Sequence, residues 1–142
     1  MSDRVDFYIL ETADAGTRET FCCRLAEKAW QQGYRVFVRT ADTAAASGLD
    51  DRLWSFRQGS FVPHAVVSAA EGEPVQIGDT LPDGPAADLL INLGEDVPDG
   101  WDRYPRIAEV VNQEPDVVGP GRARFRHYRD AGIEPQPHRL QR

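Results

Sequence analysis

The sequence has little that would stabilise a secreted scaffold or cross a membrane. Its 142 residues include two cysteines, Cys22 and Cys23, which are adjacent. Neighbouring cysteines seldom pair, because a disulfide requires Cα atoms about 5.5 Å apart, farther than one peptide step. No apolar run approaches the roughly 20 residues of a membrane helix, and no basic segment precedes the first apolar stretch. We therefore expect reduced thiols in a cytoplasmic protein without a signal peptide or a membrane partner.

Motifs for nucleotides and metals are also missing. The turn after the first expected strand, residues 11–17, contains one glycine, so neither the dinucleotide fingerprint nor the P-loop is present. The cysteines and the three histidines, His64, His127 and His138, do not have the spacing of metal ligands. The sequence therefore predicts no cofactor, no metal and no catalytic residues.

One alternative for the function is a degenerate α/β enzyme that uses His64 or Cys22. Cysteines on a helix face are more often packing residues than nucleophiles, and we expect this of Cys22 and Cys23. His64 follows a proline and has no nucleophile beside it. We therefore expect a turn histidine that forms local hydrogen bonds rather than a general base.

The order of apolar segments predicts one α/β domain. Apolar residues at helical spacing over residues 21–30, followed by Gly33, lie between two apolar runs, and this order indicates a βαβ unit with parallel strands. We expect helices to cover a mostly parallel or mixed sheet in a single domain over residues 1–134. Residues 135–142 are predicted to be a mobile tail. Strands are expected at residues 5–10, 34–39, 65–67, 74–77, 88–93 and 106–111.

The last predicted helix differs in charge from the rest of the chain. Up to Gly121 the sequence has 10 basic and 21 acidic residues, whereas from Arg122 onward it has six arginines and two acidic residues. The last element is expected over residues 115–131, with Gly132 as its stop. Gly119-Pro120-Gly121 should interrupt it, so we expect the continuous helix to begin near Pro120. Positive charge concentrated on an acidic protein indicates a binding partner.

Helical spacing divides this segment into two faces. Arg124, Tyr128 and Ala131 lie on one side, where Tyr128 and Ala131 can pack inward. The other face suits a ligand that carries both carboxylates and an apolar group, and phosphate is the rival ligand. The simpler alternative is that these arginines are only solvated and bind no ligand. Because Arg124 lies off this face, we expect its replacement by alanine to leave ligand binding nearly unchanged. The ligand face consists of Arg122, Phe125, Arg126 and Arg129.

A second cluster occurs in residues 53–64, LWSFRQGSFVPH. It has Trp54, Phe56 and Phe61 within eight residues, in a stretch that Gly59 and Pro63 prevent from being one helix. Such aromatics either pack against the edge of the domain or form a protein-binding patch, since tryptophan and other aromatics are frequent anchors of interfaces.

Over residues 5–132 the chain resembles the chi subunit family of bacterial DNA polymerase III. The resemblance is carried by DFYIL, AEKAWQQGYRVFV, LDDRLWSFRQGSFVPH, DLLINLG, RIAEVVN and RARFRHYRDAG. The combination of LW…SFVPH with a later basic segment ending in YRDAG is specific to that family. The resemblance implies a Rossmann-like α/β domain without nucleotide-binding machinery and without catalytic activity.

The resemblance also implies partners and site residues. Family members form a heterodimer with the psi subunit, which ties them to the clamp loader, and Trp54 and Phe61 match the aromatics that face psi. They also bind the acidic C-terminal tail of the single-stranded-DNA-binding protein, which ends in proline and phenylalanine. A helicase-like protein uses the psi surface in some bacteria, and DNA is contacted only indirectly. The residues that match the tail-binding helix are Arg122, Phe125, Arg126 and Arg129.

The chain departs from the family pattern at two kinds of position. Phe125 and Arg126 stand where tyrosine and lysine are frequent, and Glu114 stands where an apolar residue is expected in the wall of the pocket for the terminal phenylalanine. A different class of function is direct binding of single-stranded nucleic acid by the arginines, with Phe125 and Tyr128 as stacking surfaces. The formal net charge of −7 argues against this second hypothesis.

Overall fold

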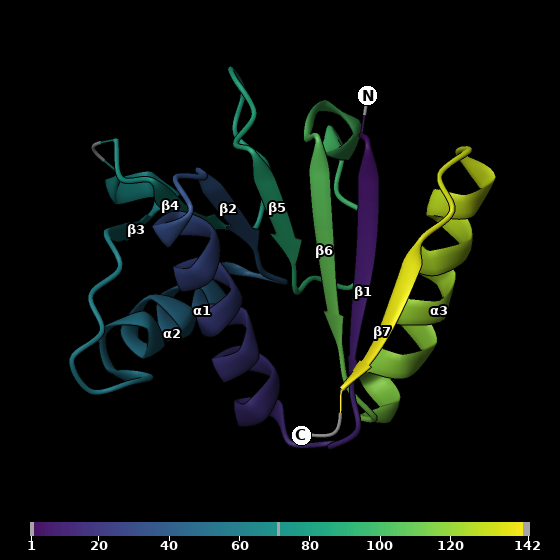
Figure 1. Cartoon of the computed structure of the whole chain (residues 1–142), viewed down its shortest axis with the longest axis horizontal. Helices are drawn as coiled ribbons and strands as arrows, with labels where there is room; N and C mark the ends of the chain where they lie inside the picture. The colour runs from purple at the N-terminus through teal and green to yellow at the C-terminus, as the bar shows by residue number, and fades with distance from the viewer. Residues whose placement is uncertain (1, 71, 141–142) are drawn as a thin grey trace.

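A seven-stranded sheet in which every strand pair is parallel forms the centre of the computed structural model, which describes residues 2–70 and 72–140 (Figure 1). The strand order is β3-β4-β2-β5-β6-β1-β7. The predicted α/β class with a mostly parallel sheet is therefore confirmed. The strands are β1 Arg4–Leu10, β2 Val36–Arg39, β3 His64–Val66, β4 Val75–Gly78, β5 Leu89–Asn92, β6 Arg106–Val111 and β7 Gln136–Leu140.

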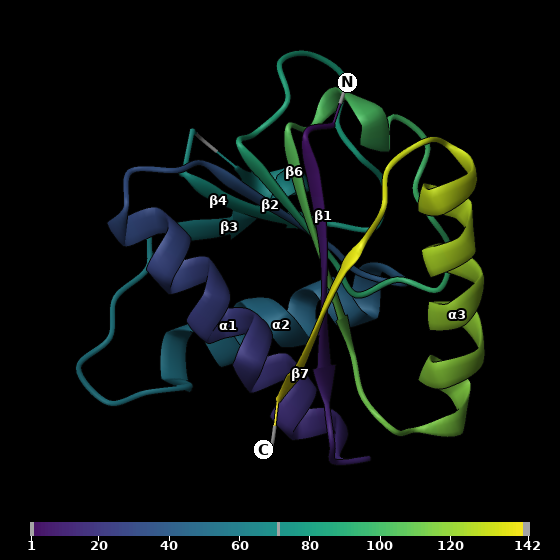
Figure 2. The same cartoon turned by 45° about the vertical axis from the view of Figure 1, so that its right-hand side comes forward.

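Helices cover both faces of the sheet. The helices α1 (Ala15–Gln31) and α2 (Thr43–Ser55) pack on one face, and α3 (Pro115–Asp130) packs on the other (Figures 1 and 2). Two short 3-10 helices, η1 (Val67–Ala69) and η2 (Trp101–Arg103), lie in the connections. Because α3 lies beside β1 and β7, the edge of the sheet near the C-terminus has a helix on one face.

Side chains that accept hydrogen bonds fix the starts of α1 and α2. The Asp14 carboxylate accepts a hydrogen bond from the Thr17 amide at 3.0 Å, and the Asp42 carboxylate accepts one from the Ala45 amide at 2.7 Å. Each bond satisfies an amide that has no partner within the helix. The carboxylate of Asp14 therefore occupies the position at which a phosphate would bind in a nucleotide-binding βαβ unit.

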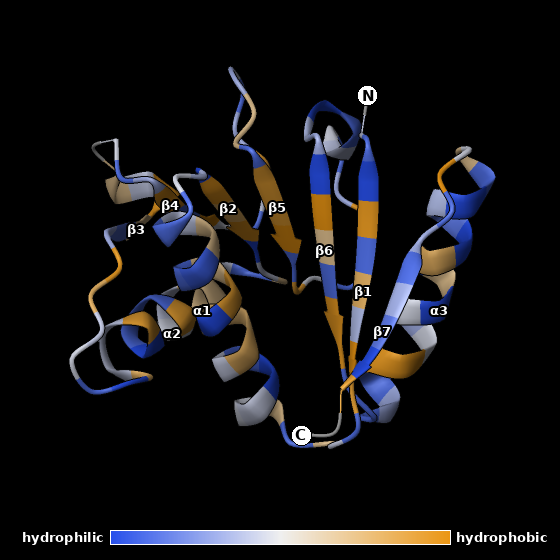
Figure 3. Ribbon diagram, in the orientation of Figure 1, coloured by the Kyte–Doolittle hydropathy of each residue, from blue (hydrophilic) through white to orange (hydrophobic). Residues whose placement is uncertain are grey.

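Successive side chains of a strand point to opposite faces of the sheet, so the hydrophobic core consists of two clusters, one on each face. In β6, Ile107 and Val111 face α3, whereas Ala108 and Val110 face α1 and α2. β2 and β5, at the centre of the sheet, are mainly apolar, whereas β7 is mainly hydrophilic (Figure 3). The apolar strands are those that the sequence predicts most directly.

Residues 115–121 belong to α3, contrary to the prediction that the helix begins near Pro120. Pro115 takes the first helical position, and Pro120 lies inside the helix, where it leaves only the carbonyl of Asp116 without its usual donor. Gly121 is buried against β6, and a Cβ atom there would lie 3.1 Å from Cγ1 of Val111. The glycine thus allows α3 to approach the sheet closely rather than interrupting it.

The predicted mobile tail is wrong for residues 136–140, which form β7 beside β1, while residues 141–142 lie outside the described part of the chain. Nε2 of His138 lies 2.8 Å from Oδ1 of the buried Asp6, and the imidazole stacks on Tyr8 with ring centroids 5.1 Å apart. These contacts join β7 to the face of the sheet that α1 covers. The domain therefore extends beyond its predicted limit at residue 134.

The adjacent thiols of Cys22 and Cys23 are both buried in the core under α1, so their predicted packing role is confirmed. Burial raises the pKa of Cys22 well above its ordinary value and that of Cys23 to about 12. A raised thiol pKa means that less thiolate, the reactive form, is present at any pH below that value.

We expect both thiols to resist a disulfide reagent at pH 8 in the folded protein. Since the pKa of Cys23 rises from 9.0 to about 12, its reaction should be slower than in guanidinium by about a thousandfold. The measurement is the rate of reaction with an aromatic disulfide in native buffer and in denaturant. Rapid labelling of either thiol in native buffer would contradict the burial.

Candidate functional site

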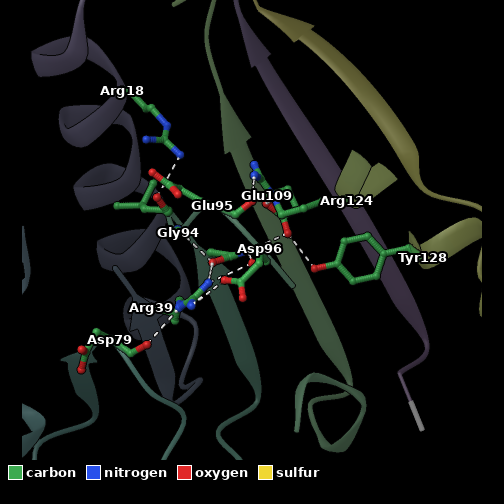
Figure 4. Close-up of polar contacts among 11 residues, drawn as sticks. Arg18, Arg39, Asp79, Gly94, Glu95, Asp96, Glu109, Arg124 and Tyr128 are labelled. Atoms are coloured by element: carbon green, nitrogen blue, oxygen red, sulfur yellow. Dashed lines mark hydrogen bonds and ion pairs between the residues drawn. The ribbon is translucent and has the colours of Figure 1, made fainter. Parts of the chain in front are cut away.

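Arginines of the chain itself fill the carboxyl ends of the central strands, where ligands of open α/β sheets usually bind (Figure 4). Nε of Arg18 donates to the Val110 carbonyl at 2.8 Å, and Nη2 donates to that of Leu93 at 3.2 Å. Arg39 donates to the carbonyls of Asp79 and Asp96 at 3.0 and 2.9 Å. The guanidinium groups thereby bind carbonyl oxygens at the strand ends that would otherwise be available to a ligand.

Glu109 is the centre of this polar layer. It lies in β6 with 0% of its surface exposed. Its carboxylate accepts hydrogen bonds from Nε of Arg124 at 2.8 Å, from the Tyr128 hydroxyl at 2.6 Å and from the side-chain Nδ2 of Asn92 at 2.9 Å. Arg124 and Tyr128 come from α3 and Asn92 comes from β5, so three elements meet at one carboxylate (Figure 4).

Arg124 and Tyr128 are therefore structural residues. Arg124 is 3% exposed, donates a further bond from Nη1 to the Glu95 carbonyl at 2.9 Å, and has one buried nitrogen, Nη2, without a hydrogen-bond partner in the described part of the chain. Burial, and then the adjacent carboxylate, raise the pKa of Tyr128 far above its usual range. The prediction that Tyr128 packs inward is confirmed, but Ala131 is exposed. Arg124 lies off the ligand face as predicted, yet it is an internal ion-pair partner rather than a neutral surface position.

A groove of about 230 Å³ lies between α3 and the strands at the edge of the sheet. Arg122 and Phe125, two of the four predicted residues of the ligand face, line it. Phe125 is half-buried, with its ring centroid 5.1 Å from that of Phe7. The floor is apolar, and its edges carry arginines and amides. The other lining residues are Phe7, Ile9, Val111, Asn112, Gln113, Val118, Gly121 and Arg139.

Arg126 and Arg129 are exposed on α3 but do not line this groove. The predicted four-residue face is therefore divided into a pair in the groove and a pair beside it. Glu114, expected in the wall of the pocket, is instead the residue that precedes the first turn of α3. Arg139 was missed because its segment was predicted to be mobile. In residues 2–70 and 72–140, the basic side chains without an ion pair or hydrogen bond are Arg24, Lys28, Arg122, Arg126, Arg129 and Arg139.

Trp54 and Phe61 form an exposed aromatic patch at the far side of the molecule, 58% and 59% exposed. Their ring centroids are 6.0 Å apart. Phe56, the third aromatic of this stretch, instead packs against the core. Exposure of two large neighbouring aromatics distinguishes this surface from ordinary edge packing.

Trp54 lies in the last turn of α2, and Glu27 of α1 holds the following loop, which carries Phe61. Nη2 of Arg57 donates to both carboxylate oxygens, at 2.8 and 2.7 Å, and the Ser60 hydroxyl also donates to Glu27. The hydrogen bond from Ser60, followed by those from Arg57, holds the pKa of Glu27 below its usual range. The loop is thus fixed on the helix before any partner binds, which lowers the cost of ordering it on binding.

His64 is buried at the base of the same loop. Nδ1 lies 2.6 Å from the Val62 carbonyl and Nε2 lies 3.0 Å from the Asp50 carbonyl. The contact with Val62 is local, as predicted, but His64 is the first residue of β3 rather than a turn residue, and Asp50 is 14 residues away in the chain. The described residues contain no group of three or more metal-ligating side chains, and within them no helix is long and apolar enough to span a membrane.

Together these features define a Rossmann-like α/β domain whose usual ligand crevice is filled by its own side chains. The family model described as "DNA polymerase III chi subunit, HolC" matches residues 1–136. The DNA polymerase III subunit chi of Pseudomonas aeruginosa is 45% identical over 139 residues, covering 98% of each chain. The Haemophilus influenzae and Escherichia coli subunits of the same name are each 30% identical, over 93% and 89% of this chain and 94% and 91% of their own. The chain belongs to the DNA polymerase III chi subunit family.

We expect Arg124→Ala to lower the free energy of unfolding by about 3–5 kcal/mol, because the change leaves the Glu109 carboxylate buried without its cation. Arg126→Ala, two residues away on the exposed face, is the matched control and should cost less than about 0.5 kcal/mol. Urea denaturation of both variants measures the difference. Equal stability of the two variants would show that the Glu109–Arg124 pair is not the anchor of α3.

Proposed function

We propose that this chi-family chain is a noncatalytic adaptor of the replicative polymerase, with a psi subunit on one surface and the acidic tail of the single-stranded-DNA-binding protein on another. The observation that carries the proposal is the groove of α3: an apolar floor bordered by arginines without partners, on a protein of net charge −7. An acidic peptide with an apolar end complements both properties. The noncatalytic part of the proposal is supported by Arg18, Arg39 and Arg124, which occupy the carboxyl ends of the strands, where a Rossmann-like sheet usually binds its ligand.

In this proposal the peptide follows the exposed arginines of α3 and ends in the groove. Its terminal phenylalanine packs on Phe7 and Phe125, and Arg122 binds a carboxylate at the mouth of the groove. Arg126 and Arg129, which are exposed beside the groove, meet acidic residues farther from the end. Exposed charge pairs contribute little individually, so the groove supplies most of the affinity.

Direct binding of single-stranded nucleic acid has less support. Tyr128, one of the two stacking residues that this hypothesis requires, is 0% exposed and bonded to Glu109. Base stacking needs an accessible aromatic face. An oligonucleotide titration remains the direct test, and saturable binding tighter than that of the peptide would favour this function instead.

Trp54 and Phe61 are proposed as the surface for psi. The two rings are exposed and adjacent, and Glu27 fixes the loop that connects them. A rigid aromatic pair is the arrangement expected of an interface hot spot. The same surface would serve a helicase-like competitor, since one aromatic patch accommodates one partner at a time.

We expect Arg122→Ala to weaken binding of an acidic, phenylalanine-terminated peptide by about tenfold, since a charge-assisted hydrogen bond at a partly desolvated site contributes about 1.5 kcal/mol. Arg126→Ala and Arg129→Ala should each cost about twofold to threefold. Calorimetric titration gives the affinities. Binding should weaken with salt but persist at pH 9, because arginine stays protonated.

The matched control is Arg24→Ala, which removes an unpaired arginine on α1, on the opposite face of the sheet. It changes the net charge by the same amount and should leave peptide affinity within about twofold. Equal losses for Arg122→Ala and Arg24→Ala would mean that only the overall charge matters, and the groove would then not be the binding site.

Trp54→Ala should abolish co-purification with a psi subunit while leaving the melting temperature nearly unchanged. A central interface tryptophan typically contributes about 2 kcal/mol or more to binding, whereas an exposed side chain contributes little to folding. Pull-down from co-expressing cells and a thermal melt provide the two readouts. Unfolding of the variant, or undiminished capture of psi, would refute the assignment of this surface.

A further inference from the structure

The groove of α3 has a second arginine that comes from the edge strand rather than from the helix. We propose that Arg139 of β7 and Arg122 of α3 form a two-sided clamp for the terminal carboxylate of the bound peptide. The clamp rests on the proposed function, and it assigns a recognition role to the edge strand β7, which lines the groove together with α3.

Strand register places Arg139 in the groove. Ile9 of β1 is paired with Arg139, and Phe7 is paired with Pro137. Residues aligned across parallel strands point to the same face, so Arg139 shares the face on which Phe7 and Ile9 pack toward α3. Since α3 packs on β6 and β1, Arg139 of the edge strand β7 joins residues of these three elements in lining the groove.

Contacts on the opposite face hold this orientation. His138, the residue before Arg139, points to the other side of the sheet, where its ring bonds to Asp6 and stacks on Tyr8. The Glu11 amide also donates to the Leu140 carbonyl at 3.2 Å. A shift of β7 by one residue would break all of these contacts and would turn Arg139 away from the groove.

Both arginines are available to a ligand. Arg122 and Arg139 are exposed, and neither has an ion pair or a hydrogen bond with any described residue. Other arginines on this face, Arg39 and Arg124, are instead held in ion pairs with Asp96 and Glu109 and donate to main-chain carbonyls. Charge complementarity therefore points to an anionic ligand at this position.

The size of the groove indicates one side chain rather than a whole metabolite. Its volume of about 230 Å³ is below the roughly 300–1,000 Å³ of small-molecule pockets. A peptide whose last side chain fills the apolar floor has its own α-carboxylate at the mouth, between the two arginines. An internal aromatic would present neutral amides there and would leave both guanidinium groups unpaired, so the clamp selects a chain terminus.

The test is a set of titrations with one acidic, phenylalanine-terminated peptide, prepared as the free acid and as the C-terminal amide. We expect Arg139→Ala to weaken binding of the free acid by about tenfold. Binding of the amide should already be weak in the unchanged protein, and Arg139→Ala should alter it by less than about twofold. Arg139→Gln, which keeps the stem of the side chain, should reproduce this pattern with an unchanged melting temperature.

Each remaining outcome separates the clamp from the proposed function. Undiminished binding of the free acid by Arg139→Ala, with the unchanged protein binding normally, would overturn the clamp and leave the groove in place. If Arg139→Ala weakened binding of the acid and of the amide equally, Arg139 would act only through its charge and not through the terminal carboxylate, and the clamp would also be overturned. Failure of the unchanged protein to bind either peptide would instead refute the proposed function itself. Arg24→Ala again serves as the charge control.

Discussion

The buried carboxylate of Glu109 is the constraint on which the groove and its helix depend. A carboxylate with no exposed surface is tolerated only when its oxygens are bonded and its charge is balanced. Arg124 and Tyr128 meet this requirement from successive turns of α3, and Asn92 meets it from β5. The rotation of α3 about its axis is thereby fixed. With Arg124 turned inward, Arg122 and Phe125 must face the groove beside it.

Much of the fold could be predicted because the signals are local. The apolar runs that became β1, β2, β5 and β6 are long enough to be recognised from composition, and the spacing within α1 marks its buried side. The ligand face of α3 was likewise predictable in part, since helical periodicity separates Arg122 and Phe125 from Arg124 without knowledge of the sheet. Helical periodicity does not show how deeply a side chain is buried. It therefore did not predict that Arg124 is buried against the carboxylate of Glu109, 15 residues earlier in the chain.

The missed features depend on contacts between distant residues. β7 contains Pro137 and little apolar surface, so its sequence resembles a tail, and it becomes a strand through the contact of His138 with Asp6, 132 residues away. Proline is tolerated because of the edge position. The carbonyl of Leu140 points to β1, so the main chain of Pro137 faces the free edge, where a missing amide costs no ladder bond. The same proline limits pairing of this edge with another strand.

Arginine serves two purposes in this molecule, and burial decides between them. Arg18, Arg39 and Arg124 close the carboxyl ends of the strands, where a Rossmann-like sheet would otherwise accept a ligand. A side chain on Gly94 would overlap the guanidinium of Arg39, so that closure also requires a glycine. With the crevice filled from within, the proposed recognition site lies instead at the edge of the sheet. There α3 and β7 border the groove, and Arg122 and Arg139, which have no ion pair or hydrogen bond with a described residue, are the groups to which the proposed acidic peptide would bind.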